Sequence, residues 1–154
     1  MYVKTDFFGK LKTDCCCIEL YSFYHAESGL NGACRKGHVQ VAELMINKGA
    51  KNWHDGLINA CHGGRIETVR LMISKDISSD ANTWNTCLIV ACHGGRIETV
   101  QLMISKGAND WIGGLSRACS GGHKDIVDLM ISKGATVCNN CMKSMNEHLE
   151  YQPI

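Results

Sequence analysis

Cysteine and histidine residues near the end of the chain have a spacing that could support metal or thiol chemistry. Cys138 and Cys141 form a Cys-x-x-Cys pair, and His148 follows seven residues later. Structural zinc takes four Cys or His ligands, so this segment would supply three and need one from elsewhere. A loop that leads into a terminal helix explains the same residues without a metal. We therefore expect no cofactor, and we keep a metal- or redox-responsive protein as the alternative function.

Two Cys-His dipeptides, Cys61-His62 and Cys92-His93, also suggest metal or thiolate chemistry. Adjacent residues of a helix diverge by about 100°, so the cysteines should face the core while the histidines face solvent. Equivalent residues on helices packed about 8–10 Å apart cannot share one ion at bonds of about 2.0–2.3 Å. The run Cys15-Cys16-Cys17 could bind metal or be acylated, although partial burial in a terminal cap explains it too. No phosphate loop or nucleophile-elbow motif is present, and we expect no enzymatic activity.

Most of the chain consists of one short unit repeated four times. An Ala-Cys pair recurs at spacings of 27, 31 and 27 residues, and a Leu-Met-Ile string follows each pair at a fixed distance. The Ala-Cys pairs are Ala33-Cys34, Ala60-Cys61, Ala91-Cys92 and Ala118-Cys119. Residues 60–75 and 91–106 differ only at Arg70 and Gln101. Such agreement indicates a repeat architecture.

Each unit predicts two helices joined by a tight turn. Residues that favour helix N-caps precede the first helix at Ser28, Asp55, Thr86 and Gly113. Glycines at 37, 64, 95 and 122 should end that helix. The second helix has an apolar stripe at Ile66, Val69, Met72 and Ile73. One such pair cannot bury its apolar face alone, so the sequence predicts an all-α solenoid.

The predicted organisation is a single structural domain. Residues 1–27 form an N-terminal capping segment, a degenerate repeat, and residues 137–154 form a C-terminal capping helix and tail. Between them, residues 28–136 hold the four repeats, at 28–54, 55–85, 86–112 and 113–136. The second repeat lacks its terminal glycine and gains four residues at about Ile77–Asp80, which predicts one longer loop.

The repeats resemble ankyrin repeats. Asp55-Gly56-Leu57-Ile58-Asn59-Ala60 stands where ankyrins have Thr-Pro-Leu-His-x-Ala, Gly37-His38 matches their turn, and Gly49-Ala50 matches their end. The period of 27 is shorter than the usual 33 or so, and the missing residues fall where ankyrins project a β-hairpin. We expect short inter-repeat loops with little β-structure. The shortened unit looks like the repeats of large DNA viruses that infect protists.

Composition narrows the range of partners. The formal net charge is +1, which gives no overall field for nucleic acid or an anionic membrane. No run of about 18 apolar residues and no signal-peptide core is present, so we expect a cytoplasmic protein, in the host cytoplasm if viral, with reduced cysteines. We expect a monomer that binds another protein.

The resemblance implies that a partner would meet the concave face, formed by the loops and the ends of the first helices. The loop positions carried over are His54, Asp55, Asn85 and Ile112. The helix-end positions are Arg35, Lys36, His62, His93 and Ser120. Trp53, Trp84 and Trp111 recur in the predicted loops, either as aromatic anchors for a partner or as a lid over the joints between repeats.

Overall fold

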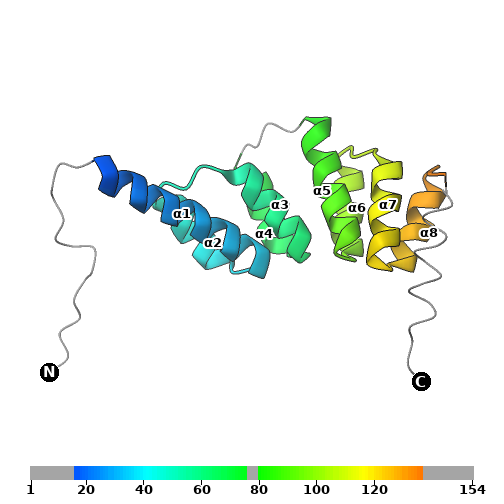
Figure 1. The fold of residues 1–154 in the computed structure, drawn as a ribbon, viewed down its shortest axis with the longest axis horizontal. Helices are drawn as coiled ribbons and strands as arrows, with labels where there is room; N and C mark the ends of the chain where they lie inside the picture. The colour runs from blue at the N-terminus through cyan, green and yellow to red at the C-terminus, as the bar shows by residue number, and fades with distance from the viewer. Residues whose placement is uncertain (1–15, 76–79, 137–154) are drawn as a thin grey trace, which may run out of the picture.

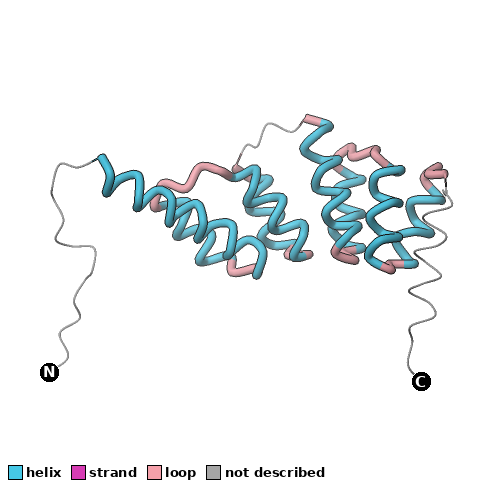
Figure 2. The backbone as a smooth tube through the Cα atoms, viewed as in Figure 1, coloured by secondary structure: helices cyan, strands magenta, loops and turns pink. Residues whose placement is uncertain are grey.

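The computed structural model describes residues 16–75 and 80–136, which form eight stacked α-helices (Figure 1). In chain order these are α1 (Cys16–Lys36), α2 (Val39–Asn47), α3 (Trp53–Gly63), α4 (Ile66–Ile73), α5 (Ala81–His93), α6 (Ile97–Ser105), α7 (Trp111–Gly121) and α8 (Lys124–Ser132). The described residues contain no strand, and short loops and turns join the helices (Figure 2). The predicted all-α solenoid with short inter-repeat loops is confirmed.

Each repeat is a pair of packed helices, from α1 and α2 in the first to α7 and α8 in the fourth. The first helices α1, α3, α5 and α7 pack in sequence and form one continuous row. Among the second helices, α2 packs on α4 and α6 packs on α8, whereas α4 and α6 make at most a marginal contact. The joint between the second and third repeats is therefore held mainly by α3 and α5.

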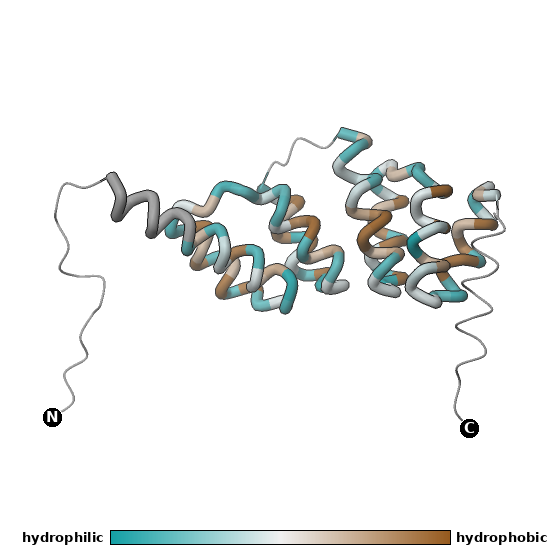
Figure 3. Tube along the Cα trace, in the orientation of Figure 1, coloured by the Kyte–Doolittle hydropathy of each residue, from teal (hydrophilic) through white to brown (hydrophobic). Residues whose placement is uncertain are grey.

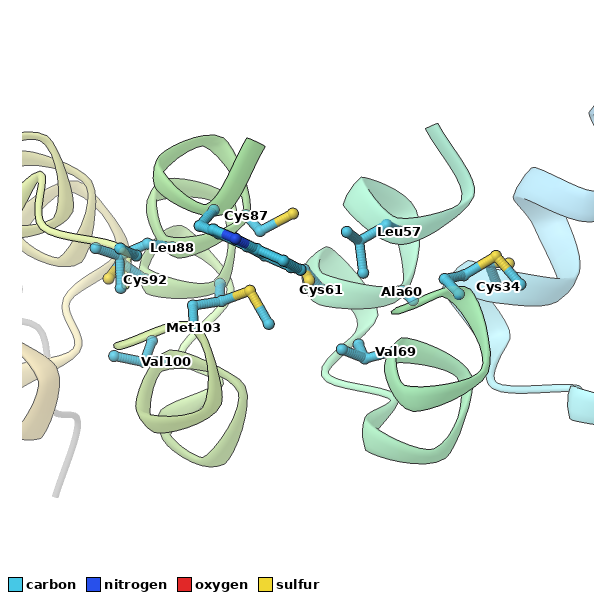
Figure 4. Close-up of a cluster of buried hydrophobic side chains, with 14 of the residues drawn as sticks. Cys34, Leu57, Ala60, Cys61, Val69, Cys87, Leu88, Cys92, Val100 and Met103 are labelled. Carbon is cyan, nitrogen blue, oxygen red and sulfur yellow. The ribbon is translucent and has the colours of Figure 1, made fainter. Parts of the chain in front are cut away.

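Apolar stretches recur along the helices (Figure 3), and their buried side chains meet in the core of the stack (Figure 4). Leu57 and Leu88 are fully buried, as are the Ala-Cys pairs of the same two helices. Val69 and Met72 of α4 close the core from the second-helix side, and both are 0% exposed. Equivalent residues of successive repeats thus form layers, as expected when each repeat buries its neighbour's face.

Three of the first helices begin earlier than the sequence predicts. Side-chain oxygens of Asn52, Asp80 and Asp110 accept hydrogen bonds from backbone N–H groups three residues ahead, at 3.3, 2.8 and 2.9 Å. The predicted N-caps at Asp55, Thr86 and Gly113 were wrong, since these residues lie inside helices. Asn and Asp cap helices as well as Ser does, and an earlier start extends the helix by about a turn.

The first helix also begins before its predicted start. α1 has 21 residues and passes through Ser28 without interruption, so Ser28 is not an N-cap. Residues 16–27 therefore continue the first helix of the first repeat. Neither α1 nor any other described helix has the length and hydropathy that a membrane crossing requires.

The three tryptophans lie in helices, which corrects their predicted placement in loops. Trp53 and Trp111 are the first residues of α3 and α7, and Trp84 lies in the first turns of α5. Trp84 is 6% exposed, and the other two are half-buried against the core. The indole N–H of Trp53 donates to the carbonyl of Ala50 at 3.0 Å. This packing supports the lid interpretation over the partner-anchor interpretation.

The four-residue insertion is only partly a loop. Asp80 is the N-cap of α5, and α5 has an added turn before Trp84 that α3 and α7 lack before their tryptophans. Residues 77–79 lie outside the described part of the chain, as do residues 1–15 of the predicted N-terminal cap (1–27) and the whole predicted C-terminal cap, residues 137–154.

The first helices end at glycines as predicted. Gly64 and Gly122 adopt φ values of +66° and +71°, which side chains other than glycine rarely tolerate. The N–H of Gly64 bonds to the Cys61 carbonyl at 3.1 Å, and that of Arg65 bonds to the Ala60 carbonyl at 3.0 Å. These bonds satisfy carbonyls that the helix end would otherwise leave unpaired.

Two buried threonines suggest a stabilising substitution. The hydroxyl oxygens of Thr68 and Thr99 have no hydrogen-bond partner among the described residues, and both side chains are at most 1% exposed. The first and fourth repeats carry Val41 and Ile126 at the same position. Thr68→Val should raise the free energy of unfolding by about 1 kcal/mol, because it removes an unsatisfied buried hydroxyl. Urea denaturation would measure this change, and a drop in stability would indicate an unseen hydrogen bond.

Candidate interaction surface

The ends of the first helices lie in close succession along the stack. A Cβ atom added at Gly63 would collide with the carbonyl oxygen of Arg35. One added at Gly94 would lie 2.9 Å from the His62 carbonyl oxygen, and one at Gly121 would lie 2.7 Å from that of His93. Glycine is needed at these positions because each helix end approaches the backbone of the preceding repeat. The predicted residues Arg35, His62 and His93 are therefore brought together at repeat spacing.

The turns that follow α1, α3 and α5 are each covered by a cationic or imidazole side chain from the next repeat. A Cβ at Gly37 would lie 2.8 Å from Cδ of Arg65, and a Cβ at Gly64 would collide with Arg96. His123 Nε2 lies 3.1 Å from the His93 carbonyl oxygen, within hydrogen-bond distance. Positive groups are favoured at helix C-termini, where the carbonyl dipoles point outward.

Burial and neighbouring basic groups together lower the pKa of the central histidine of this cluster. The pKa of His62 lies below the ordinary 6.5, first because of partial burial and then because Arg35, His93 and Arg96 repel its proton. We call Arg35, His62, His93 and Arg96 the basic row. Three successive repeats contribute to it, and its arginines and His93 are exposed while His62 is half-buried. Such a row attracts anionic groups.

The lowered pKa of His62 gives a pH dependence whose sign can be stated. Below about pH 6.5, His62 is protonated in the unfolded chain while it is still neutral in the folded protein. The free energy of unfolding therefore falls as the pH drops through that range. NMR titration of His62 should give a midpoint below 6.5. Arg35→Gln should move the midpoint upward, while Arg70→Gln on α4 should leave it unchanged. A midpoint at or above the ordinary value would contradict the placement of Arg35.

The predicted placement of His54, Asn85 and Ile112 in loops was wrong, because they lie inside α3, α5 and α7. Two of these positions form hydrogen bonds between repeats. His54 Nε2 lies 3.3 Å from the Thr83 hydroxyl oxygen, and Asn85 accepts from the backbone N–H of Asn109 at 2.7 Å and of Asp110 at 3.1 Å. Glu27, at the same repeat position, accepts from the N–H of Lys51 at 2.7 Å. Glu27 and Asn85 connect α1 and α5 to the loop that precedes the next first helix, and His54 connects α3 to α5, so all three side chains are engaged within the stack.

The remaining predicted positions differ in their surroundings. Asp55 accepts a hydrogen bond from the side-chain amide of Asn52 at 2.6 Å, within the first turn of α3. Ile112 occupies the same repeat position as Asn85 and is 65% exposed. Lys36 and Ser120 are exposed at the ends of α1 and α7. Glu27 was not predicted, although it is in register with His54 when the repeats are aligned.

The repeat cysteines are buried thiols. Cys34, Cys61, Cys87, Cys92 and Cys119 are all reduced and buried. Burial raises the pKa of Cys34 to about 11 and that of Cys92 to about 12, so thiolate formation is disfavoured. The predicted inward Cys and outward His arrangement is confirmed at Cys92-His93, where the cysteine is buried and the histidine is exposed.

The metal hypothesis concerns residues that the structure does not describe. Cys138, Cys141 and His148 all lie beyond residue 136. Within residues 16–75 and 80–136, no three Cys, His, Asp or Glu side chains are placed to hold an ion together.

Comparison with known protein families agrees with the fold. Residues 30–113 and 57–141 each match the family described as ankyrin repeats (three copies), and together they cover well over half of the sequence. No curated protein matches the chain. Because the two matches together span more than half of the sequence, the chain belongs to the ankyrin-repeat family.

Proposed function

We propose that this protein is a non-enzymatic adaptor that holds a protein partner on the first-helix side of the stack, and that the partner presents acidic groups there. The observation that carries this proposal is the basic row, in which the guanidinium groups of Arg35 and Arg96 flank the imidazoles of His62 and His93 near the ends of α1, α3 and α5. Ankyrin repeats typically mediate protein–protein interactions, and this supports the general assignment.

The same proposal places Lys36 and Ser120 in the contact surface, because they extend the row at either end. His54 and Asn85 contribute less to binding under this proposal, because their polar atoms already hold the next repeat. Ile112, being 65% exposed, supplies an apolar contact at the far edge. Asp55 borders the surface from the first turn of α3.

The finer assignment is a viral protein that acts as a monomer on a host factor in the host cytoplasm. The shortened 27-residue period and the near-identical second and third repeats support this proposal. It involves neither nucleic acid nor membrane.

Affinity capture with two charge-matched variants tests the binding surface. Arg35→Glu with Lys36→Glu reverses two exposed charges on the first-helix side. Arg70→Glu with Lys106→Glu makes the same change in net charge on α4 and after α6. The first variant should lose a partner captured from host cytosol, whereas the second should retain it, both with the wild-type melting temperature. Equal retention by both variants would refute the proposed surface.

A further inference from the structure

One cysteine departs from the repeat pattern at a position where the other three repeats have glycine. Cys87 of α5 is in register with Gly29, Gly56 and Gly114. It is 0% exposed, and so is Cys61 of the preceding repeat. Both lie in the core between α3 and α5 (Figure 4).

The glycine-containing repeats show what this position faces. A Cβ built at Gly56 lies 3.4 Å from Sγ of Cys34, and one built at Gly114 lies 3.3 Å from Sγ of Cys92. Those sulfurs belong to the cysteine of the preceding Ala-Cys pair. In a disulfide, the Cβ of one cysteine lies about 3 Å from the sulfur of the other. A cysteine at this position is therefore placed for a bond to the preceding repeat.

At the joint between the second and third repeats, the two sulfurs do approach each other. Contact with the Cys87 thiol, together with burial, raises the pKa of Cys61. The same joint carries the four-residue insertion, and its second helices α4 and α6 make at most a marginal contact. Local opening is easiest where few contacts hold two elements together, and such opening would admit a small oxidant.

We infer that Cys61 and Cys87 form an inter-repeat disulfide site, which a low-molecular-weight disulfide such as oxidised glutathione closes. When the joint opens, one of the two thiols becomes exposed to water and ionises; this thiolate attacks a glutathione sulfur, forms a mixed disulfide and releases one reduced glutathione. The second protein thiolate displaces the other glutathione. Two electrons pass from the protein sulfurs to glutathione, and the two thiol protons end on the two reduced glutathione molecules. The new bond ties α3 to α5.

Incubation of the native full chain with oxidised glutathione tests the site. Its mass should fall by about two units, for two hydrogen atoms lost, and proteolysis without reductant should release a peptide pair joined through Cys61 and Cys87. The melting temperature should rise on the order of 10 °C, because the bond closes a loop in the unfolded chain. Dithiothreitol should reverse both changes. Absence of this peptide pair, or the mixture of linkages that the unfolded chain gives, would overturn the inference.

Variants at the register position separate a specific bond from general thiol oxidation. Cys87→Gly restores the residue of the other repeats and should abolish the linkage at Cys61. Adding Gly56→Cys to that variant should move the linkage to Cys34, at the joint between α1 and α3. If the double variant formed no disulfide between Cys34 and the substituted position 56, the position within the repeat would not determine where the bond forms.

Discussion

Gly63→Ala should lower the free energy of unfolding by about 3 kcal/mol, although one methyl group is the only change. The new Cβ would collide with the backbone carbonyl oxygen of Arg35, in the preceding repeat. A backbone atom cannot rotate away as a side chain can, so α1 and α3 must separate. Thermal and urea denaturation measure the loss, and Gly121→Ala, with its Cβ 2.7 Å from the His93 carbonyl oxygen, should behave similarly.

Gly32→Ala is the matched control. Gly32 lies in α1, it is exposed, and an added Cβ would meet nothing within 4 Å. Alanine favours helix over glycine by about 1 kcal/mol, so this variant should be slightly more stable than wild type. If Gly63→Ala were as stable as Gly32→Ala, the close approach of successive helix ends would be contradicted.

Trp84→Ala is the second large expected effect. The side chain is 6% exposed and belongs to the core, so its removal should cost about 3–5 kcal/mol of unfolding free energy. The loss should be concentrated at the joint between the second and third repeats, which α3 and α5 mainly hold. Faster hydrogen exchange of the α5 backbone amides would show that the loss of stability lies at this joint.

Ile112→Ala provides the comparison for Trp84. Ile112 is 65% exposed, and its truncation should change the unfolding free energy by no more than about 0.5 kcal/mol. A Trp84 variant that melted like wild type but captured less partner would favour the anchor interpretation over the lid.

The repeat pattern predicted the fold because each local signal is repeated four times. The Leu and Ala-Cys positions are buried in every copy, and the Met position is buried in the last three. Helix starts were predicted less well, because Asn52 and Asp55 are both good caps and lie one turn apart. The packing of Trp53 and Trp84 against the core determines which candidate residue caps the helix. This packing involves residues far away in the chain, so a short stretch of sequence does not reveal it.

The surface was predictable only in part, for a related reason. Periodicity placed His93 outward and Cys92 inward. It did not reveal that Asn85 reaches the backbone of the next repeat, since that contact depends on how two repeats stack. The difference between Cys87 and the glycines in register is visible in the sequence. Its proximity to the Cys61 thiol emerges only from the stacked structure.

Site-specific photo-crosslinking tests the central claim, that the partner lies against the first-helix side. A photoreactive amino acid would replace His93 at the end of α5 or, in a second protein, Gln101 on α6, which is exposed in the same repeat. We predict that irradiation in host cytosol joins a partner to position 93 and not to position 101. Cross-linking from position 101 alone, or equally from both, would contradict the proposed surface.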